Sequence, residues 1–180
     1  PHQTYTRYVN EFALNEEEAR LLSDNPDMKT FYEDAISRHA NYKGVANWVT
    51  NELIRELKGR DLEALPFKGR EIGQLVGLID EGVISGKIGK EVLIHLIAQG
   101  GTPQDIVEKR GLRQVKDEQS LKPLVEQVVE RNPHSVKDYH DGKTKVIGFL
   151  VGQVMKESRG KANPAMVNTL LKELLDEKDG

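Results

Sequence analysis

The sequence predicts an all-α protein, a helical bundle domain followed by a small helical tail domain. Apolar residues recur at steps of three and four along most of the chain, while the alternating runs typical of strands are almost absent. Four Asn-Pro or Thr-Pro pairs, at 25–26, 102–103, 132–133 and 163–164, also mark helix starts. Of the 180 residues, 37% are hydrophobic and 31% charged, which suits a packed core under a charged helical surface.

The first part of the chain predicts several short helices. Asn15 precedes three glutamates and is expected to cap a helix, because the helix dipole favours acidic residues in a first turn. A second helix is expected to begin at Asn25-Pro26. One stripe between Gly44 and Gly59 predicts a single helix, and its apolar members are Val45, Trp48, Val49, Leu53, Ile54 and Leu57. Apolar stripes at 72–79 and 92–97, with glycines between them, predict a helical hairpin.

Four further helices are expected in the remaining chain. Helices beginning at Thr102-Pro103 and Asn132-Pro133 are expected to stop at Gly111 and Gly142, because glycine favours the left-handed conformation that ends a helix. An apolar stripe over 146–155 predicts the third of these helices. The last is expected to run from Asn163-Pro164 to about Asp176.

Charge divides the chain into two parts. Residues 1–109 hold 13 basic and 18 acidic side chains, a net charge of −5, whereas residues 110–180 hold 13 and 11, a net charge of +2. We therefore expect one domain over 1–111 and a tail domain over 112–180, and the tail is the candidate anion binder. Within the tail, residues 143–161 carry five cations and one carboxylate.

Several chemistries are excluded by the composition and the motifs. The chain has no cysteine, so disulfides, thiolate nucleophiles and cysteine-ligated metals are ruled out. The Gly82 to Ile88 segment lacks the glycine spacing and the Ser or Thr of a phosphate loop. His134 and His140 stand six residues apart and fall on different faces of a helix. We therefore predict no catalytic residue and no metal site in this chain.

No apolar run approaches the length of about 20 residues that spans a bilayer. The chain is therefore predicted to be cytoplasmic, without a membrane partner.

The basic segment allows two interpretations. Lys143 and Lys145 precede the helix predicted over 146–155, and Lys156, Arg159 and Lys161 follow it. The segment is either a solvated surface, with cations favoured at a helix C-terminus, or a phosphate-binding corner beside the helix start at Asn163. Composition leaves both open. Only Tyr139 and Phe149 are aromatic after residue 110, so few side chains could stack on bases. Any RNA is therefore expected to be recognised by its shape and backbone.

Motifs at both ends of the chain carry a family likeness. They are Arg7-Tyr8-Val9, Tyr32-Glu33-Asp34-Ala35, Ala46-Asn47-Trp48-Val49, Glu52-Leu53, Ile84-Ser85-Gly86-Lys87, Val151-Gly152-Gln153-Val154-Met155-Lys156 and Gly160-Lys161-Ala162-Asn163-Pro164. Together they resemble the C-terminal part of the GatB family, which carries the GatB/YqeY domain. Members of this family are B subunits of the aspartyl/glutamyl-tRNA(Asn/Gln) amidotransferase.

The resemblance implies a fragment of a larger enzyme of protein biosynthesis. The parent is a carbon-nitrogen ligase that amidates Glu-tRNA(Gln) or Asp-tRNA(Asn), using ATP, magnesium and ammonia from glutamine hydrolysed on GatA. It works as a heterotrimer with GatA and GatC. In that family an N-terminal cradle domain holds the catalytic chemistry, and this chain has no counterpart of it. We therefore expect the chain to be inert by itself, to bind no cofactor, and to take tRNA(Gln) or tRNA(Asn) as its partner.

The family's tail domain reaches the D-loop side of the tRNA elbow, which turns the basic segment into a candidate RNA-binding site. The leading candidates are Lys143, Lys145, Lys156, Arg159, Lys161 and Asn163, followed by Lys172, Lys116, Lys122 and Lys137. The competing prediction is a protein-interaction module, a stand-alone YqeY-like protein or an adaptor without RNA contact. Its exposed anchor would be Trp48, Phe67 or Tyr42. Salt dependence separates the two, because phosphate contacts weaken steeply with salt.

Overall fold

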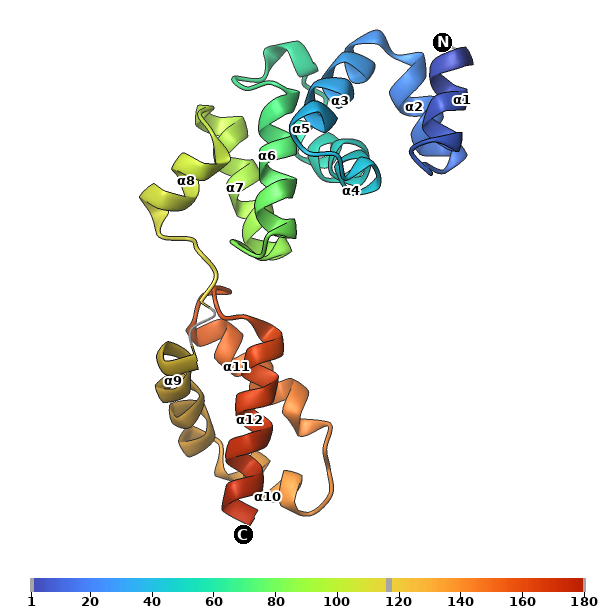
Figure 1. Ribbon diagram of the computed structural model, residues 1–180. Coiled ribbons are helices and arrows are strands. Elements are labelled where there is room, and N and C mark those ends of the chain that lie inside the picture. Colours follow the sequence, from blue (N-terminus) through green and yellow to red (C-terminus); the bar gives the residue numbers. More distant parts are fainter. Residues whose placement is uncertain (1, 116–117, 180) are drawn as a thin grey trace. The chain divides into compact units, whose positions relative to one another are not determined.

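A computed structural model describes residues 2–115 and 118–179 and confirms the all-α prediction (Figure 1). The chain forms two compact units, Pro1–Leu112 and Arg113–Gly180, which we call the bundle unit and the tail unit. The bundle unit contains α1 His2–Asn10, α2 Glu16–Asp24, α3 Pro26–Arg38, α4 Tyr42–Asn47, a π-helix Trp48–Leu53, α5 Ile54–Leu57, a 3-10 turn Leu62–Ala64, α6 Gly69–Asp80, α7 Gly86–Gln99 and α8 Pro103–Arg110. The tail unit contains α9 Glu118–Arg131, α10 Pro133–His140, α11 Val146–Glu157 and α12 Pro164–Asp179.

Helices begin at all four predicted pairs, but one cap differs from the prediction. The side-chain oxygens of Asn25, Thr102 and Asn163 accept hydrogen bonds from backbone N–H groups two or three residues later. Asn132 does not cap α10. Its Nδ2 donates to the Val128 carbonyl at 2.8 Å instead, so this side chain closes the end of α9.

The single helix predicted between Gly44 and Gly59 is interrupted by a π-helical segment. A straight α-helix would place Leu57 about 120° away from Val45 around the axis, since each residue turns about 100°. The wider π turn absorbs one residue and returns Leu57 to within about 20° of Val45. Both side chains are buried, whereas Ile54, which the sequence placed on the core face, is 41% exposed.

Glycines four residues apart bring α6 against α3. A Cβ atom added to Gly69 would overlap the carbonyl oxygen of Phe31, and one added to Gly73 would overlap that of Ala35. The backbone of α6 therefore lies directly on the backbone of α3, which no larger residue at these two positions would permit. This contact was not predicted from the sequence, because α3 and α6 lie far apart along the chain.

The aromatic residues of the bundle unit pack inside it. Trp48 and Phe67 are buried, so the prediction that they serve as exposed anchors is wrong. Tyr42 is half-buried and stacks on Phe12 with ring centroids 4.0 Å apart. Tyr8 is buried, and its hydroxyl donates to Glu33 Oε1 at 2.7 Å. Burial and this hydrogen bond raise the pKa of the Tyr8 phenol.

The tail unit has its own hydrophobic core, formed between α9, α11 and α12. Leu121, Leu150, Val154 and Leu171 are all almost fully buried there. The segment before α9 is tied to this core by Val115, whose N–H donates to the Lys161 carbonyl and whose carbonyl accepts from the N–H of Asn163. This isolated bridge fixes the backbone of the basic segment just before α12 begins.

No helix within the described residues combines the length and the apolarity needed to cross a bilayer.

Candidate nucleic-acid interface

The five cations of the basic segment fall into two groups at opposite ends of α11. Lys143 and Lys145 precede the helix, and Lys156, Arg159 and Lys161 lie at its last turn and beyond. The backbone positions of Lys145 and Lys156 are about 17 Å apart, at 1.5 Å per residue. Only the second group meets the start of α12 at Asn163, so the predicted phosphate-binding corner excludes the two lysines at 143 and 145.

The turn between α11 and α12 is held by a dense set of hydrogen bonds. The Ser158 hydroxyl donates to the Met155 carbonyl at 3.1 Å and accepts from the N–H of Ala162 at 3.2 Å. The N–H of Gly160 also donates to Met155, at 2.8 Å. Because the backbone is fixed, the cations carried by this turn are presented from a rigid base, which lowers the entropy lost on binding.

Arg159 occupies a backbone conformation that usually belongs to glycine. Its φ is +56°, followed by Gly160 at +79°. A non-glycine residue in the left-handed region costs roughly 1 kcal/mol, and such strain often marks a functional position. The side chain of Arg159 is exposed, and Ala13 and Lys58 of the bundle unit adopt the same left-handed conformation.

Arg131 joins this group from the end of α9, a contribution that was not predicted from the sequence. Its Nη1 lies 3.3 Å from Glu157 Oε1, the only carboxylate among residues 143–161. The pair neutralises Glu157 locally, so the side chains of Lys156 and Arg159 are left beside a net positive surface. The two residues are 26 positions apart, and no local pattern links them.

The lysines before α11 lie in a different environment. Lys143 Nζ is 3.8 Å from Asp138 Oδ1, and His134 Nε2 approaches the same carboxylate at 3.7 Å. Lys145 is exposed at the first residue before α11. This end of the helix therefore carries less net positive charge than the turn at the other end.

Asn163 and Lys172 have limited roles in such a site. The Oδ1 of Asn163 is used by the α12 cap, where it accepts from the N–H of Met166 at 3.1 Å, and its amide N–H₂ group is the remaining donor. Glu118 and Glu173 line the cavity of about 390 Å³ beside Asn163, which disfavours an anion on that side. Lys172 is exposed on α12, about 13 Å along the helix from Asn163.

The second-rank lysines stand on other helices where the structure describes them. Lys122 and Lys137 are exposed on α9 and α10, and Lys116 lies outside the described residues.

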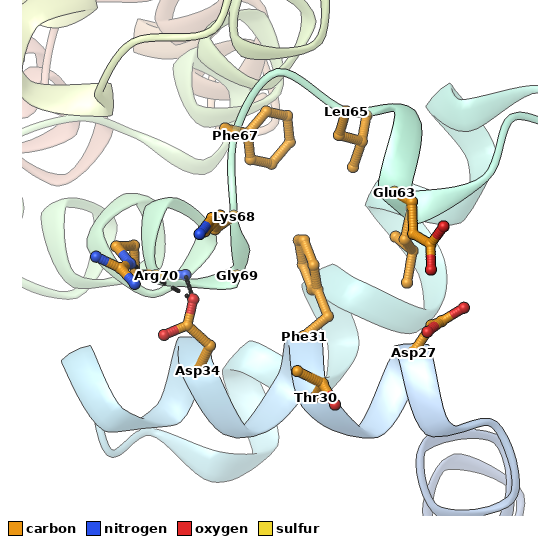
Figure 2. A pocket seen from close by; sticks show the side chains of 11 residues that line it. Asp27, Thr30, Phe31, Asp34, Glu63, Leu65, Phe67, Lys68, Gly69 and Arg70 are labelled. Carbon is orange, nitrogen blue, oxygen red and sulfur yellow. Dashed lines mark hydrogen bonds and ion pairs between the residues drawn. The ribbon is translucent and has the colours of Figure 1, made fainter.

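The bundle unit contains a pocket of about 590 Å³ between α3 and the segment that leads into α6 (Figure 2). Phe31, Leu65 and Phe67 form its apolar part, and Figure 2 shows Asp34 and Arg70 facing each other at one side. Asp34 Oδ2 accepts from the N–H of Arg70 at 2.9 Å and lies 3.6 Å from its Nε. This carboxylate therefore anchors the first turn of α6, a structural task that explains its position without a reaction.

Among the residues that the structure describes, no three or more His, Asp or Glu side chains are grouped so that they could hold a metal ion.

Comparison with known proteins shows the family to which the chain is similar. A profile of the family described as "GatB domain" matches residues 30–175. The B subunit of the aspartyl/glutamyl-tRNA(Asn/Gln) amidotransferase of Persephonella marina is 45% identical over 178 residues, which is 97% of this chain and 38% of that protein. The B subunits from a Picosynechococcus strain and from Carboxydothermus hydrogenoformans are both 41% identical, with 97% of this chain and 36% and 37% of those proteins covered. The chain thus spans less than two fifths of the length of these relatives.

Proposed function

Because the chain belongs to the GatB domain family, we propose that it is the tRNA-binding C-terminal part of an amidotransferase GatB protein. Its role is to hold mischarged tRNA, by the elbow on the D-loop side, for amidation elsewhere in the parent enzyme. Single phosphate contacts of exposed cations are individually weak, so the grip depends on several of them acting together.

One observation carries this proposal: the hydrogen-bonded turn after α11 carries three cations, and the carboxylate beside them, Glu157, is paired with Arg131. Lys156 and Arg159 are exposed, and Lys161 is half-buried. Arg131 forms an ion pair with Glu157. Arg159 adds a guanidinium to this turn at a position where glycine would be less strained. Several cations carried by one hydrogen-bonded turn suit the phosphates of a folded RNA.

The chemistry of amidation belongs, in this proposal, to the rest of the parent enzyme. ATP and magnesium would act on the part of GatB outside these 180 residues, and GatA and GatC would complete the heterotrimer. The chain itself binds and orients, so it raises the local concentration of the tRNA acceptor end at the reaction site. We propose no catalytic residue within it.

The test is the binding of tRNA(Gln) to the 180-residue chain across a salt series, followed by fluorescence anisotropy. In the Lys156→Glu, Arg159→Glu, Lys161→Glu triple variant, affinity is expected to fall about 100-fold at 0.1 M salt. This loss corresponds to about 1 kcal/mol for each of three phosphate contacts. The slope of log affinity against log salt is expected to fall by about 2 to 3.

A matched control carries the same change in net charge on the bundle unit. Lys29, Lys87 and Lys109 are exposed there, and their replacement by glutamate is expected to change affinity less than about threefold. A second probe is a tRNA with an altered D-loop, which should bind more weakly to the unmodified chain. Equal losses in both triple variants would contradict the proposal, because they would show a response to net charge alone.

A further inference from the structure

The outer face of α11 is unusual in what it presents to solvent. Lys145, Gly148, Phe149, Gly152 and Lys156 are all exposed and fall within an arc of about 100°. Leu150 and Val154, on the opposite side of the helix, are fully buried in the core of the tail unit. We call the five exposed residues the glycine face; it contains no carboxylate.

The two glycines of this face have no packing role within the tail unit. A Cβ atom added to Gly148 or to Gly152 would meet no atom within 4 Å. Glycine inside a helix lowers helix stability by about 1 kcal/mol relative to alanine. Two such residues therefore destabilise α11, and no contact within the tail unit compensates for this. Close approach of another molecule to the helix backbone gives these positions a reason.

Phe149 lies between the glycines and is 51% exposed, as exposed as any large hydrophobic side chain described. An exposed aromatic ring on a helix face flanked by small residues forms a ridge beside a shallow depression. At both ends of this ridge stand cations, so the occupant that complements the face is anionic along its length. A polyanionic backbone with apolar sugar surfaces meets this requirement, and the other candidate, an acidic helix of a protein, is separated by the test.

We propose that the glycine face of α11 lies in the shallow minor groove of a double-stranded RNA stem. This inference rests on the proposed function and specifies how the tail unit holds its RNA. Lys145 and Lys156 would reach phosphates at the two borders of the groove, Phe149 would pack on ribose, and the glycines would let the backbone approach the 2′-hydroxyls. The minor groove of A-form RNA is wide and shallow enough to be read in this way, by shape and sugar.

The test fills the depression without changing any charge. Gly148→Gln and Gly152→Gln, singly and together, are expected to raise the thermal midpoint, because glutamine is a better helix former and the space is open. Affinity of the 180-residue chain for tRNA(Gln) is expected to fall at least about tenfold in the double variant, with the salt slope unchanged. Phe149→Ala is expected to lower affinity about fivefold, because the apolar contact of the ring with ribose is lost.

A control and a competitor complete the experiment. Thr169→Gln places the same side chain on the exposed surface of α12 and should leave affinity unchanged. A hairpin of double-stranded RNA should compete with tRNA for the chain, and a DNA hairpin of the same sequence should compete at least about fivefold less well, since B-form DNA has a narrow minor groove without 2′-hydroxyls.

Two results would overturn the inference, and they separate it from the proposed function. Unchanged tRNA affinity in the double glutamine variant, together with a large loss in the triple charge reversal, would refute the minor-groove contact. The proposed function would then stand, and the glycine face would be left to a protein partner. If neither set of variants changed affinity, both proposals would fail.

Discussion

Glycines stand four residues apart in α6 and again in α11, yet the two pairs do opposite things. Gly69 and Gly73 of the bundle unit admit the backbone of α3, so that pair is explained inside its own unit. Gly148 and Gly152 of the tail unit meet nothing within 4 Å. The same spacing therefore has different consequences in the two units, and only the structure shows which pair is packed.

The largest effect should come from breaking the internal pair. Gly73→Ala is expected to destabilise the bundle unit by more than about 3 kcal/mol, because the added methyl group would overlap the Ala35 carbonyl and lie 3.1 Å from Arg38 Cβ. Trp48, the only tryptophan, is buried in the bundle unit and reports its unfolding by fluorescence in urea.

The matched change in the other unit should have the opposite sign. Gly152→Ala is expected to stabilise α11 by about 0.5 to 1 kcal/mol, measured as slower amide hydrogen exchange along that helix. A loss of stability in this variant would mean that the position is packed after all.

The two ends of α11 should differ in their contribution to RNA binding. Lys143→Glu with Lys145→Glu is expected to weaken tRNA binding by about tenfold, less than the triple change at the other end. In the free chain, Lys143 Nζ lies 3.8 Å from Asp138 Oδ1, so the carboxylate already compensates part of the lysine charge. Anisotropy titrations at fixed salt give the ratio, and equal effects per charge would show that the two ends are equivalent.

Arg159 allows backbone strain and charge to be separated in the tail unit. Arg159→Gly should stabilise the turn by up to about 1 kcal/mol, since glycine adopts positive φ without strain. The same variant should bind tRNA several-fold more weakly because it lacks the guanidinium. Arg159→Lys restores the charge but keeps the strain, and it should recover most of the affinity with the original stability.

The smallest expected effect is a pH dependence confined to the bundle unit. Asp80 accepts from His39 Nε2 at 2.6 Å and from Asn41 Nδ2 at 2.8 Å, and these contacts join the loop after α3 to the end of α6. Partial burial acts to raise the pKa of Asp80, but the two hydrogen bonds and the His39 charge outweigh it and lower the pKa.

Because the folded pKa is depressed, this contribution is present above the unfolded value near 4 and is lost as pH falls through the folded value. Asp80→Asn should therefore lower stability at pH 7 by less than about 1 kcal/mol, since the group is partly exposed. It should also reduce the acid sensitivity of the Trp48 unfolding transition below pH 4. An unaltered pH profile would exclude Asp80 as the titrating group.

The candidate site was predictable where its signal was local. Lys156, Arg159 and Lys161 are close in sequence around a glycine turn, and the Asn163 cap follows from residue type. Arg131 was missed because its contact with Glu157 spans 26 residues. Phe149 was counted as one of few aromatics, but its exposure depends on which face of α11 the core takes.

The sequence alone determined the all-α fold, the helix starts at proline and the charge difference between the two parts, because these depend on periodicity, capping and composition within a few residues. Only the tertiary structure decided that the helix after Gly44 contains a π turn and that α6 lies on the backbone of α3. It also buried Trp48 and Phe67 while leaving Phe149 in solvent. Those outcomes depend on contacts between helices that are far apart in the sequence. Packing between these helices decides them, because local sequence preferences favour neither alternative.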